Sequence, residues 1–145
     1  MRIFISSTLK SEWNREYNQR VCAALESAGF LCYLPQRDVH PESARTVFLQ
    51  NTNAIRRADV LLAVAKNENA NLGVELGFAF GINKPVIILA GQQDRIPSML
   101  AGMGGEILRF PDLDSIQTYI DELIRKLQSR ARCESVEKGP DLKGA

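Results

Sequence analysis

Apolar residues in this chain form short continuous runs, and these alternate with segments of helical period. The runs that indicate strands cover 2–6, 31–34, 60–65, 85–89 and 107–110. Runs such as 60–65 and 85–89 are apolar at every position instead of alternating with polar residues, which is typical of parallel strands covered on both faces. The pattern therefore predicts a buried parallel sheet.

The segments between these runs place apolar residues three or four positions apart, as amphipathic helices do. They cover 13–28, 43–57, 72–80 and a last segment that starts at Asp114 or Ser115 as N-cap and keeps its apolar face to Leu127. Strand and helix thus alternate about five times. This order predicts an α/β three-layer sandwich, a flavodoxin-like five-stranded parallel sheet with helices on both faces.

The apolar pattern stops after Gln128, and the mixed-charge remainder has no core face. We therefore expect one domain over 1–128 and a loose tail over 129–145. A length of 145 residues, 45% of them hydrophobic and 24% charged, also fits a single globular domain.

Net charge and hydropathy exclude several classes of partner. A net charge of +1 gives no general attraction to a nucleic acid polymer or to an anionic membrane. No apolar run approaches a signal-peptide core or the roughly 20 residues of a membrane span. We expect a cytoplasmic protein that binds any anionic ligand through a few local groups.

Cysteine and histidine usage argues against metal chemistry. Cys22, Cys32 and Cys133 form no C-x-x-C pair, and His40 is the single histidine. Their spacing predicts neither a disulfide framework nor a metal site, and no cofactor is expected.

Ligands of open parallel sheets bind outside the carboxyl ends of the strands. Of the segments placed there, 71–80 is the most unusual because Glu75 lies in an apolar helix start with no positive charge at helical spacing. The helix dipole is the only evident local factor favouring the charged form. Glu75 is a candidate nucleophile, and an equally weighted alternative is a solvated acid that complements the helix N-terminus.

Two further features carry hydrogen-bonding groups. Hydroxyls at Ser6, Ser7 and Thr8 with the cation Lys10 follow the first strand and suit a phosphate or a sugar, although helix capping explains them as well. Asn51 falls on the apolar stripe of its own helix. A buried amide needs partners, which a ligand or an adjoining loop would supply.

These residues lie in motifs that resemble the nucleoside 2-deoxyribosyltransferase family, including its 2'-deoxynucleoside 5'-phosphate N-hydrolase branch. The resemblance covers 2–127. It rests on the motifs Arg2-Ile3-Phe4-Ile5, Leu34-Pro35-Gln36-Arg37-Asp38, Ala58-Asp59-Val60, Gly73-Val74-Glu75-Leu76-Gly77 and Asn83-Lys84-Pro85-Val86. The resemblance implies that Glu75 attacks the anomeric carbon and forms a covalent glycosyl intermediate, with Asp38 and Asn51 near the base.

The sequence departs from the family pattern at three places. Phe4 stands where many members have a Tyr that contacts the nucleophile, so we expect that hydroxyl to be missing. Asn51 stands where many have Asp, and an amide cannot act as a general acid. Asn69 or Asn71 replaces the Asp or Ser that precedes the Glu.

The resemblance leaves transfer and hydrolysis open. The N-hydrolase branch is similar in having a hydroxyl and a cation after the first strand, here Thr8 and Lys10. It also has a serine like Ser98, which comes from the neighbouring subunit, and this implies a homodimer or a higher homo-oligomer. Transferases hold the 5'-hydroxyl with carboxylate or amide groups, for which Asn69 or Asn71 would serve.

A different class of function also remains open. The first strand, Arg37-Asp38 and the Glu-Leu pair after the third strand also resemble TIR domains, some of which bind or cleave NAD. That resemblance implies a nucleotide-binding or signalling module with weak or no catalysis. Gly77 and Asn83-Lys84-Pro85 fit the deoxyribosyltransferases better.

Overall fold

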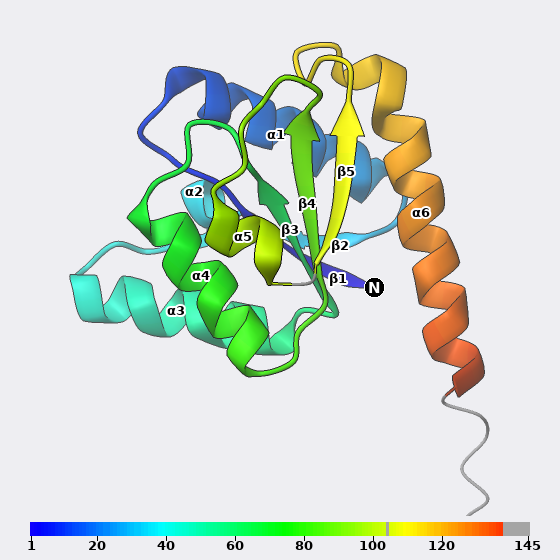
Figure 1. Ribbon diagram of the computed structural model, residues 1–145. Helices are drawn as coiled ribbons and strands as arrows, with labels where there is room; N and C mark the ends of the chain where they lie inside the picture. Colours follow the sequence, from blue (N-terminus) through cyan, green and yellow to red (C-terminus); the bar gives the residue numbers. More distant parts are fainter. Residues whose placement is uncertain (104, 138–145) are drawn as a thin grey trace, which may run out of the picture.

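The computed structural model describes residues 1–103 and 105–137, with side chains to 133. Its centre is one parallel sheet in the order β2-β1-β3-β4-β5 (Figure 1). The strands are β1 (Arg2–Ser6), β2 (Leu31–Tyr33), β3 (Val60–Val64), β4 (Val86–Gly91) and β5 (Glu106–Phe110). The flavodoxin-like fold predicted from the sequence is confirmed.

Helices cover both faces of this sheet (Figure 1). α1 (Glu12–Ser27) and α6 (Ile116–Glu137) pack on one face, whereas α3 (Ala44–Arg57), α4 (Ala70–Gly81) and α5 (Ser98–Gly102) pack on the other. The short helix α2 (Pro35–Asp38) follows β2. The sheet is therefore the middle of three layers.

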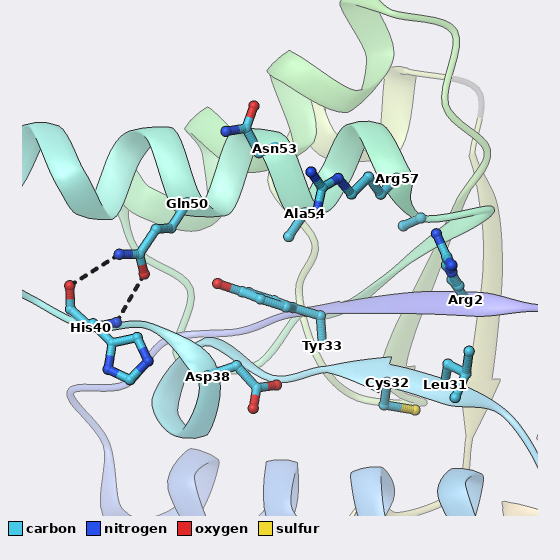
Figure 2. A pocket seen from close by; sticks show the side chains of 11 residues that line it. Arg2, Leu31, Cys32, Tyr33, Asp38, His40, Gln50, Asn53, Ala54 and Arg57 are labelled. Carbon is cyan, nitrogen blue, oxygen red and sulfur yellow. Dashed lines mark hydrogen bonds between the residues drawn. The ribbon is translucent and has the colours of Figure 1, made fainter.

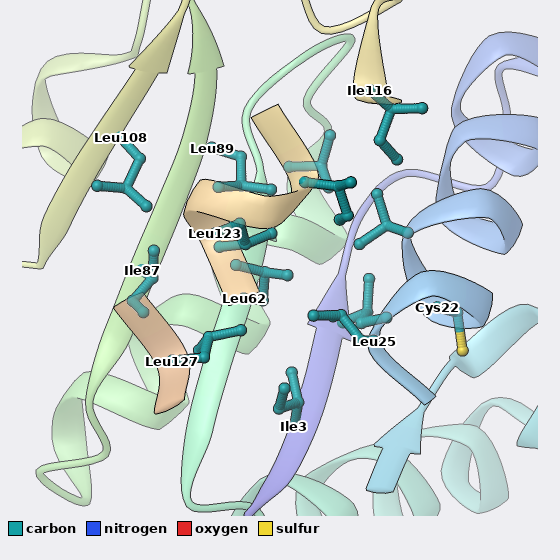
Figure 3. Packing of buried hydrophobic residues seen from close by; sticks show 14 of the residues in the cluster. Ile3, Cys22, Leu25, Leu62, Ile87, Leu89, Leu108, Ile116, Leu123 and Leu127 are labelled. Atoms are coloured by element: carbon teal, nitrogen blue, oxygen red, sulfur yellow. The ribbon is translucent and has the colours of Figure 1, made fainter. Parts of the chain in front are cut away.

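Alternation along the strands creates two hydrophobic cores. Ile3 and Ile5 of β1 point to the α1 and α6 side, where Leu25 and Leu123 meet them in a fully buried cluster (Figure 3). Phe4 points to the opposite face, into the cluster formed with α3 and α4. Because every second residue faces each helix layer, a central strand must be apolar throughout, as the sequence pattern indicated.

The C-terminal helix is longer than the sequence pattern predicted. The loose tail was expected from residue 129, but α6 continues to Glu137. No Gly or Pro interrupts the segment before Gly139, and Arg130 and Lys126 pair with Glu106 of β5 at 3.3 and 3.6 Å. The helix thus continues through 129–133, where none of the side chains is buried. Residues 138–145 of the expected tail lie outside the described residues.

The start of α4 matters most for the site. The helix was expected from residue 72, but it begins at Ala70 because Asn69 is its N-cap, whose Oδ1 accepts a hydrogen bond from the Leu72 amide at 3.2 Å. The loop from β3 and the start of α4 therefore lie at the carboxyl end of the sheet, next to the loop that follows β1.

Candidate active site

Glu75 lies in the second turn of α4, not in its first. No acidic residue occupies the first turn, so the helix dipole, which acts mainly on the terminal turn, contributes little to Glu75. The expectation that the dipole favours its charged form was therefore wrong. That expectation assumed that the helix begins at residue 72, whereas it begins at Ala70.

Two side chains from other elements donate hydrogen bonds to the Glu75 carboxyl group. Ser6 Oγ at the end of β1 donates to Oε2 at 2.5 Å, and Asn51 Nδ2 of α3 donates to Oε1 at 3.2 Å. Burial raises the pKa of Glu75 to about 7, and the Ser6 hydrogen bond opposes that rise only in part. No cation pairs with the carboxylate among the described ion pairs. Glu75 therefore changes protonation state near neutral pH.

A cavity of about 390 Å³ opens in front of this carboxyl group. Most of the residues singled out in the sequence line it together with Glu75: Ser7, Lys10, Asn51, Asn69 and Asn71. Its opposite wall comes from α2 and the residues after it, including Pro35, Gln36 and Val39. A second cavity of about 280 Å³ between α3 and α4 shares Glu75, Asn51 and Asn71. This is the volume of a small organic ligand, reached by one carboxyl group, several amides and one lysine.

Thr8 and Asn69 are hydrogen-bonded to each other next to the cavity, and of the two only Asn69 lines it. Thr8 is 2% exposed, and its Oγ1 accepts hydrogen bonds from Asn69 Nδ2 at 2.8 Å and from the Lys10 amide at 3.3 Å. Asn69 is thus engaged by the helix cap and by Thr8. Asn71 is exposed and makes no side-chain hydrogen bond to any described residue. Of the two asparagines that the sequence left open, Asn71 is the one whose amide is available to a ligand.

Asp38 lies beside a different cavity, of about 560 Å³, which Tyr33 and His40 also line (Figure 2). Its carboxylate accepts hydrogen bonds from the Leu34 amide at 2.8 Å and from Arg37 Nε at 2.8 Å. Burial pushes the pKa of Asp38 upward, but these two donors and the Arg37 charge outweigh it and hold the pKa below its ordinary value. The Asp38 carboxylate is thus held within α2, and Asp38 is not among the residues that line the Glu75 cavities.

Phe4 is fully buried and stacks on Tyr33, with ring centroids 5.4 Å apart. The hydroxyl group expected to be missing at this position is supplied two residues later by Ser6, which β-strand alternation places on the same face as Phe4. The hydroxyl is thus absent at position 4, as expected, and Glu75 is bonded by the Ser6 hydroxyl instead. The alternation of side chains along the strand could have predicted this contact, because it places Ser6 and Ser7 on opposite faces of the sheet.

Ser98 is the first residue of α5 and is exposed. It lines neither the Glu75 cavities nor the Asp38 cavity. Within one chain, therefore, the structure does not bring Ser98 to Glu75.

Sequence reasoning also missed Asn14, which is fully buried on α1. Its Nδ2 donates to Ser7 Oγ at 3.0 Å and to the Lys66 carbonyl at 2.9 Å, and its Oδ1 accepts from Asn67. Asn14 thereby ties together the loops that follow β1 and β3. A polar residue on the apolar stripe of the first helix was the signal that could have found it.

The described residues contain no group of three or more His, Cys, Asp or Glu side chains that could hold a metal ion. In the same part of the chain, no helix is long and apolar enough to cross a membrane. The site that the described residues form is organised around one buried carboxyl group.

Comparison with known proteins identifies the family. The sequence model of the nucleoside 2-deoxyribosyltransferase family matches residues 3–132. No curated protein matches the chain significantly. The chain belongs to the nucleoside 2-deoxyribosyltransferase family.

Solved structures agree on the fold. A 2-deoxyribosyltransferase from Bacillus psychrosaccharolyticus is 20% identical with a TM-score of 0.66, covering 82% of this chain and 92% of its own. A CMP N-glycosidase from Clostridium botulinum is 15% identical with a TM-score of 0.62, covering 85% and 98%. The TIR domain of a Toll-related receptor from Hydra magnipapillata is 20% identical with a TM-score of 0.64, covering 87% and 97%. At these identities the likeness shows the fold alone.

Proposed function

We propose that this protein cleaves the N-glycosidic bond of 2'-deoxynucleosides or their 5'-monophosphates, with Glu75 as the nucleophile. The observation that carries the proposal is the buried Glu75 carboxyl group, aimed by Ser6 and Asn51 at a cavity of nucleoside size. Membership of the nucleoside 2-deoxyribosyltransferase family supports this class of reaction.

In the first step, a Glu75 oxygen attacks the anomeric carbon and forms a glycosyl ester. The bond from that carbon to the base nitrogen breaks, and its electron pair leaves with the base, which takes up a proton. In the second step, water or the nitrogen of a second base attacks the same carbon and loses a proton, and the Glu75 carboxylate leaves. Water gives hydrolysis, and a second base gives transfer.

Asn51 has two roles in this scheme. Its Nδ2 holds one carboxyl oxygen of Glu75 in place, while its Oδ1 is buried without a described hydrogen-bond partner. An unsatisfied buried acceptor costs about 1–3 kcal/mol. An N–H group of a bound base would satisfy it, which is why we place the base next to Asn51.

The 5' end of the substrate lies toward Lys10 and Asn71 in this proposal. Lys10 is the one cation that lines the described Glu75 cavities, and it suits a phosphate. The exposed amide of Asn71 suits a 5'-hydroxyl group equally well. The geometry of one chain therefore supports both the monophosphate N-hydrolase and the transferase form of the reaction.

The test is a panel of purine and pyrimidine deoxynucleosides, ribonucleosides and their 5'-monophosphates, each with and without an acceptor base and analysed by chromatography. Free base without exchange indicates hydrolysis, and an exchanged nucleoside indicates transfer. Glu75→Gln is expected to abolish both, whereas Glu68→Gln, an exposed acid on the preceding loop, should keep the activity. No product from any substrate, or full activity in Glu75→Gln, contradicts the proposal.

The proposal includes a homodimer. Helices α3 and α4 expose Phe48 at 52% and Val74 at 56% beside the smaller Glu75 cavity, and Met99 next to Ser98 is 86% exposed. Large exposed apolar side chains of this kind are typical of protein contacts. A second copy seated on this surface could bring its Ser98 to the 5' end of the ligand.

Light scattering after size exclusion tests this assembly. The parent chain should be a dimer, and Phe48→Ser should shift it toward the monomer. Ser98→Ala should reduce the use of 5'-monophosphates and leave the use of unphosphorylated nucleosides unchanged. A monomeric parent chain with full activity contradicts the dimer.

The second candidate is a TIR-like nucleotide-binding module with weak or no catalysis. It is favoured by Asn51, which cannot protonate a leaving base, and by a Glu75 that is partly protonated near pH 7. Saturable nucleotide binding without turnover, measured by calorimetry beside the product assay, would support this candidate over the first.

A further inference from the structure

Two cysteines that are ten positions apart in sequence lie together between α1 and β2. Cys22 is buried on α1 and is 2% exposed, whereas Cys32 on the edge strand β2 is partly exposed. Figure 2 shows Cys32 on the face of β2 opposite to Tyr33, toward α1, and Figure 3 shows Cys22 on α1 in the same core. The two side chains pack in the same hydrophobic cluster, and the thiol groups lie close enough for each to shift the pKa of the other. Sequence spacing gave no sign of this pair.

Arg37 connects the two cysteines. Its Nη1 lies 3.5 Å from Cys22 Sγ, and its Nη2 donates to the Cys32 carbonyl at 2.9 Å. The same guanidinium group donates to Glu26 at 2.9 Å and to Asp38 at 2.8 Å, which fixes its position over the sulfur. The Cys22 sulfur therefore lies against a cation that is also bonded to the backbone of Cys32.

This environment favours a thiolate at Cys22. The neighbouring Cys32 thiol, followed by the Arg37 charge, lowers the pKa of Cys22 although burial opposes it. The Cys22 sulfur and burial raise the pKa of Cys32, which keeps its proton. A thiolate beside a protonated thiol is the arrangement that thiol oxidation requires, because the first sulfur attacks and the second resolves.

We propose that Cys22 and Cys32 form an oxidisable thiol pair that a hydroperoxide converts into an intramolecular disulfide. The Cys22 thiolate attacks the terminal peroxide oxygen, the O–O bond breaks, and the alkoxide or hydroxide leaves and is protonated. The resulting sulfenic acid is attacked at sulfur by Cys32, which loses its proton, and water leaves. Two thiols and one hydroperoxide thus give one disulfide, one alcohol or water, and one further water.

Access to the buried sulfur is through Arg37. The side chain of Arg37 covers the sulfur and is itself 45% exposed, so a peroxide reaches Cys22 when this one side chain leaves its ion pairs with Glu26 and Asp38. Cys22, Cys32 and Arg37 do not line the Glu75 cavity, although Gln36, the residue before Arg37 in α2, does. The thiol pair is therefore independent of the proposed glycosidic reaction.

The experiment uses the full chain carrying Cys133→Ser, which removes the exposed third thiol and its intermolecular disulfides. The folded protein is treated with hydrogen peroxide, then alkylated and examined by intact mass and peptide mapping. We expect a loss of about 2 Da, the two thiol hydrogens, and a cross-linked peptide pair that contains Cys22 and Cys32.

Single variants in the same background assign the roles. Cys32→Ser should stop at a sulfenic acid on Cys22, a gain of about 16 Da that a sulfenic acid reagent traps. Cys22→Ser should react at least about tenfold more slowly, and Arg37→Gln should slow the parent reaction, with partial rescue by Arg37→Lys. Circular dichroism verifies that each variant is folded.

Three outcomes overturn the inference. They are oxygen addition in the parent without the 2 Da loss, unchanged thiols in folded protein under conditions that oxidise the unfolded chain, and equal rates for Cys22→Ser and the parent. None of these measurements depends on the substrate panel, so the thiol pair and the proposed function fail separately.

Discussion

Ser6 Oγ donates a hydrogen bond of 2.5 Å to Glu75 Oε2 across 69 positions of sequence. The hydroxyl ends the second strand in the sheet order, and the carboxyl group lies one turn into the helix that follows the third. This contact is the one that lowers the pKa of Glu75 against the rise caused by burial. The balance places the ionisation of the proposed nucleophile at about 7, where small changes in its surroundings alter its charge.

The rate should therefore depend on pH through Glu75. A nucleophilic carboxylate acts only when ionised, so kcat/KM should rise with pH about tenfold per unit below 7 and level off above it. Initial rates of base release between pH 5 and 9, corrected for the reaction without enzyme, measure this. A rate that is constant or that falls across pH 7 would show that Glu75 does not act as the ionised nucleophile.

Sequence patterns predicted the layers of this fold well and the surroundings of Glu75 less well. The central strands β3 and β4 follow from continuous apolar runs, because burial on both faces leaves no position free for a polar residue. The cavity depends on contacts between residues far apart in sequence, such as Asn14 with the Lys66 carbonyl. No periodicity within one element reports those contacts.

Glu75 itself illustrates the limit. Its isolation among apolar residues singled it out, and the structure buries its carboxyl group beside a cavity. The direction of the Glu75 pKa shift could not be predicted from the sequence, because the shift depends on the burial of the carboxyl group and on the residue at which α4 begins. Likewise, the family resemblance implied that Asp38 lies near the base, whereas its carboxylate is held by Arg37 and the Leu34 amide and lines a different cavity.

Ser6→Ala should move the pH dependence. Loss of the donor removes the contact that stabilises the carboxylate, so the pKa of Glu75 should rise further above its ordinary value. At pH 7 we expect a loss of roughly tenfold in kcat/KM, which largely recovers at pH 9. The measurement is the midpoint of the pH profile.

Ser7→Ala is the matched control, because that neighbouring hydroxyl accepts from Asn14 and makes no described bond to Glu75. Its profile should keep the midpoint of the parent. Equal midpoints for the parent and Ser6→Ala would contradict the role assigned to this hydrogen bond.

Glu75 should also lower the stability of the fold at neutral and higher pH. The folded pKa of about 7 exceeds the ordinary value of 4.5, so the stability present below pH 4.5 is lost as the pH rises to about 7. A shift of this size corresponds to at most roughly 3 kcal/mol. Glu75→Gln removes this titration and should be more stable than the parent at pH 8 but not at pH 4.

Urea unfolding at the two pH values measures the difference. Glu68→Gln serves as the control for the change in net charge, since Glu68 is exposed on the loop before α4. Its unfolding free energy should follow that of the parent at both values. If Glu75→Gln is no more stable than the parent at pH 8, the carboxyl group is better solvated than its burial indicates.

Asn51→Ala should lower the rate without moving the pH midpoint. The Asn51 amide holds Glu75 Oε1 at 3.2 Å, but burial and Ser6 account for the pKa of Glu75, so the effect of Asn51 is positional. Misplacing a nucleophile and losing a base contact together should reduce kcat/KM about 10- to 100-fold at every pH. Because the unpartnered Oδ1 also disappears, the ligand-free protein should not lose more than about 1 kcal/mol of stability.

Asn53→Ala is the control from the exposed side of the same helix, where the side chain bonds only Arg56 among the described contacts, and it should keep the parent rate. A shifted midpoint in Asn51→Ala, or a rate equal to that of Asn53→Ala, would mean that Asn51 does not orient the carboxylate, and the base would then have to be placed elsewhere in the cavity.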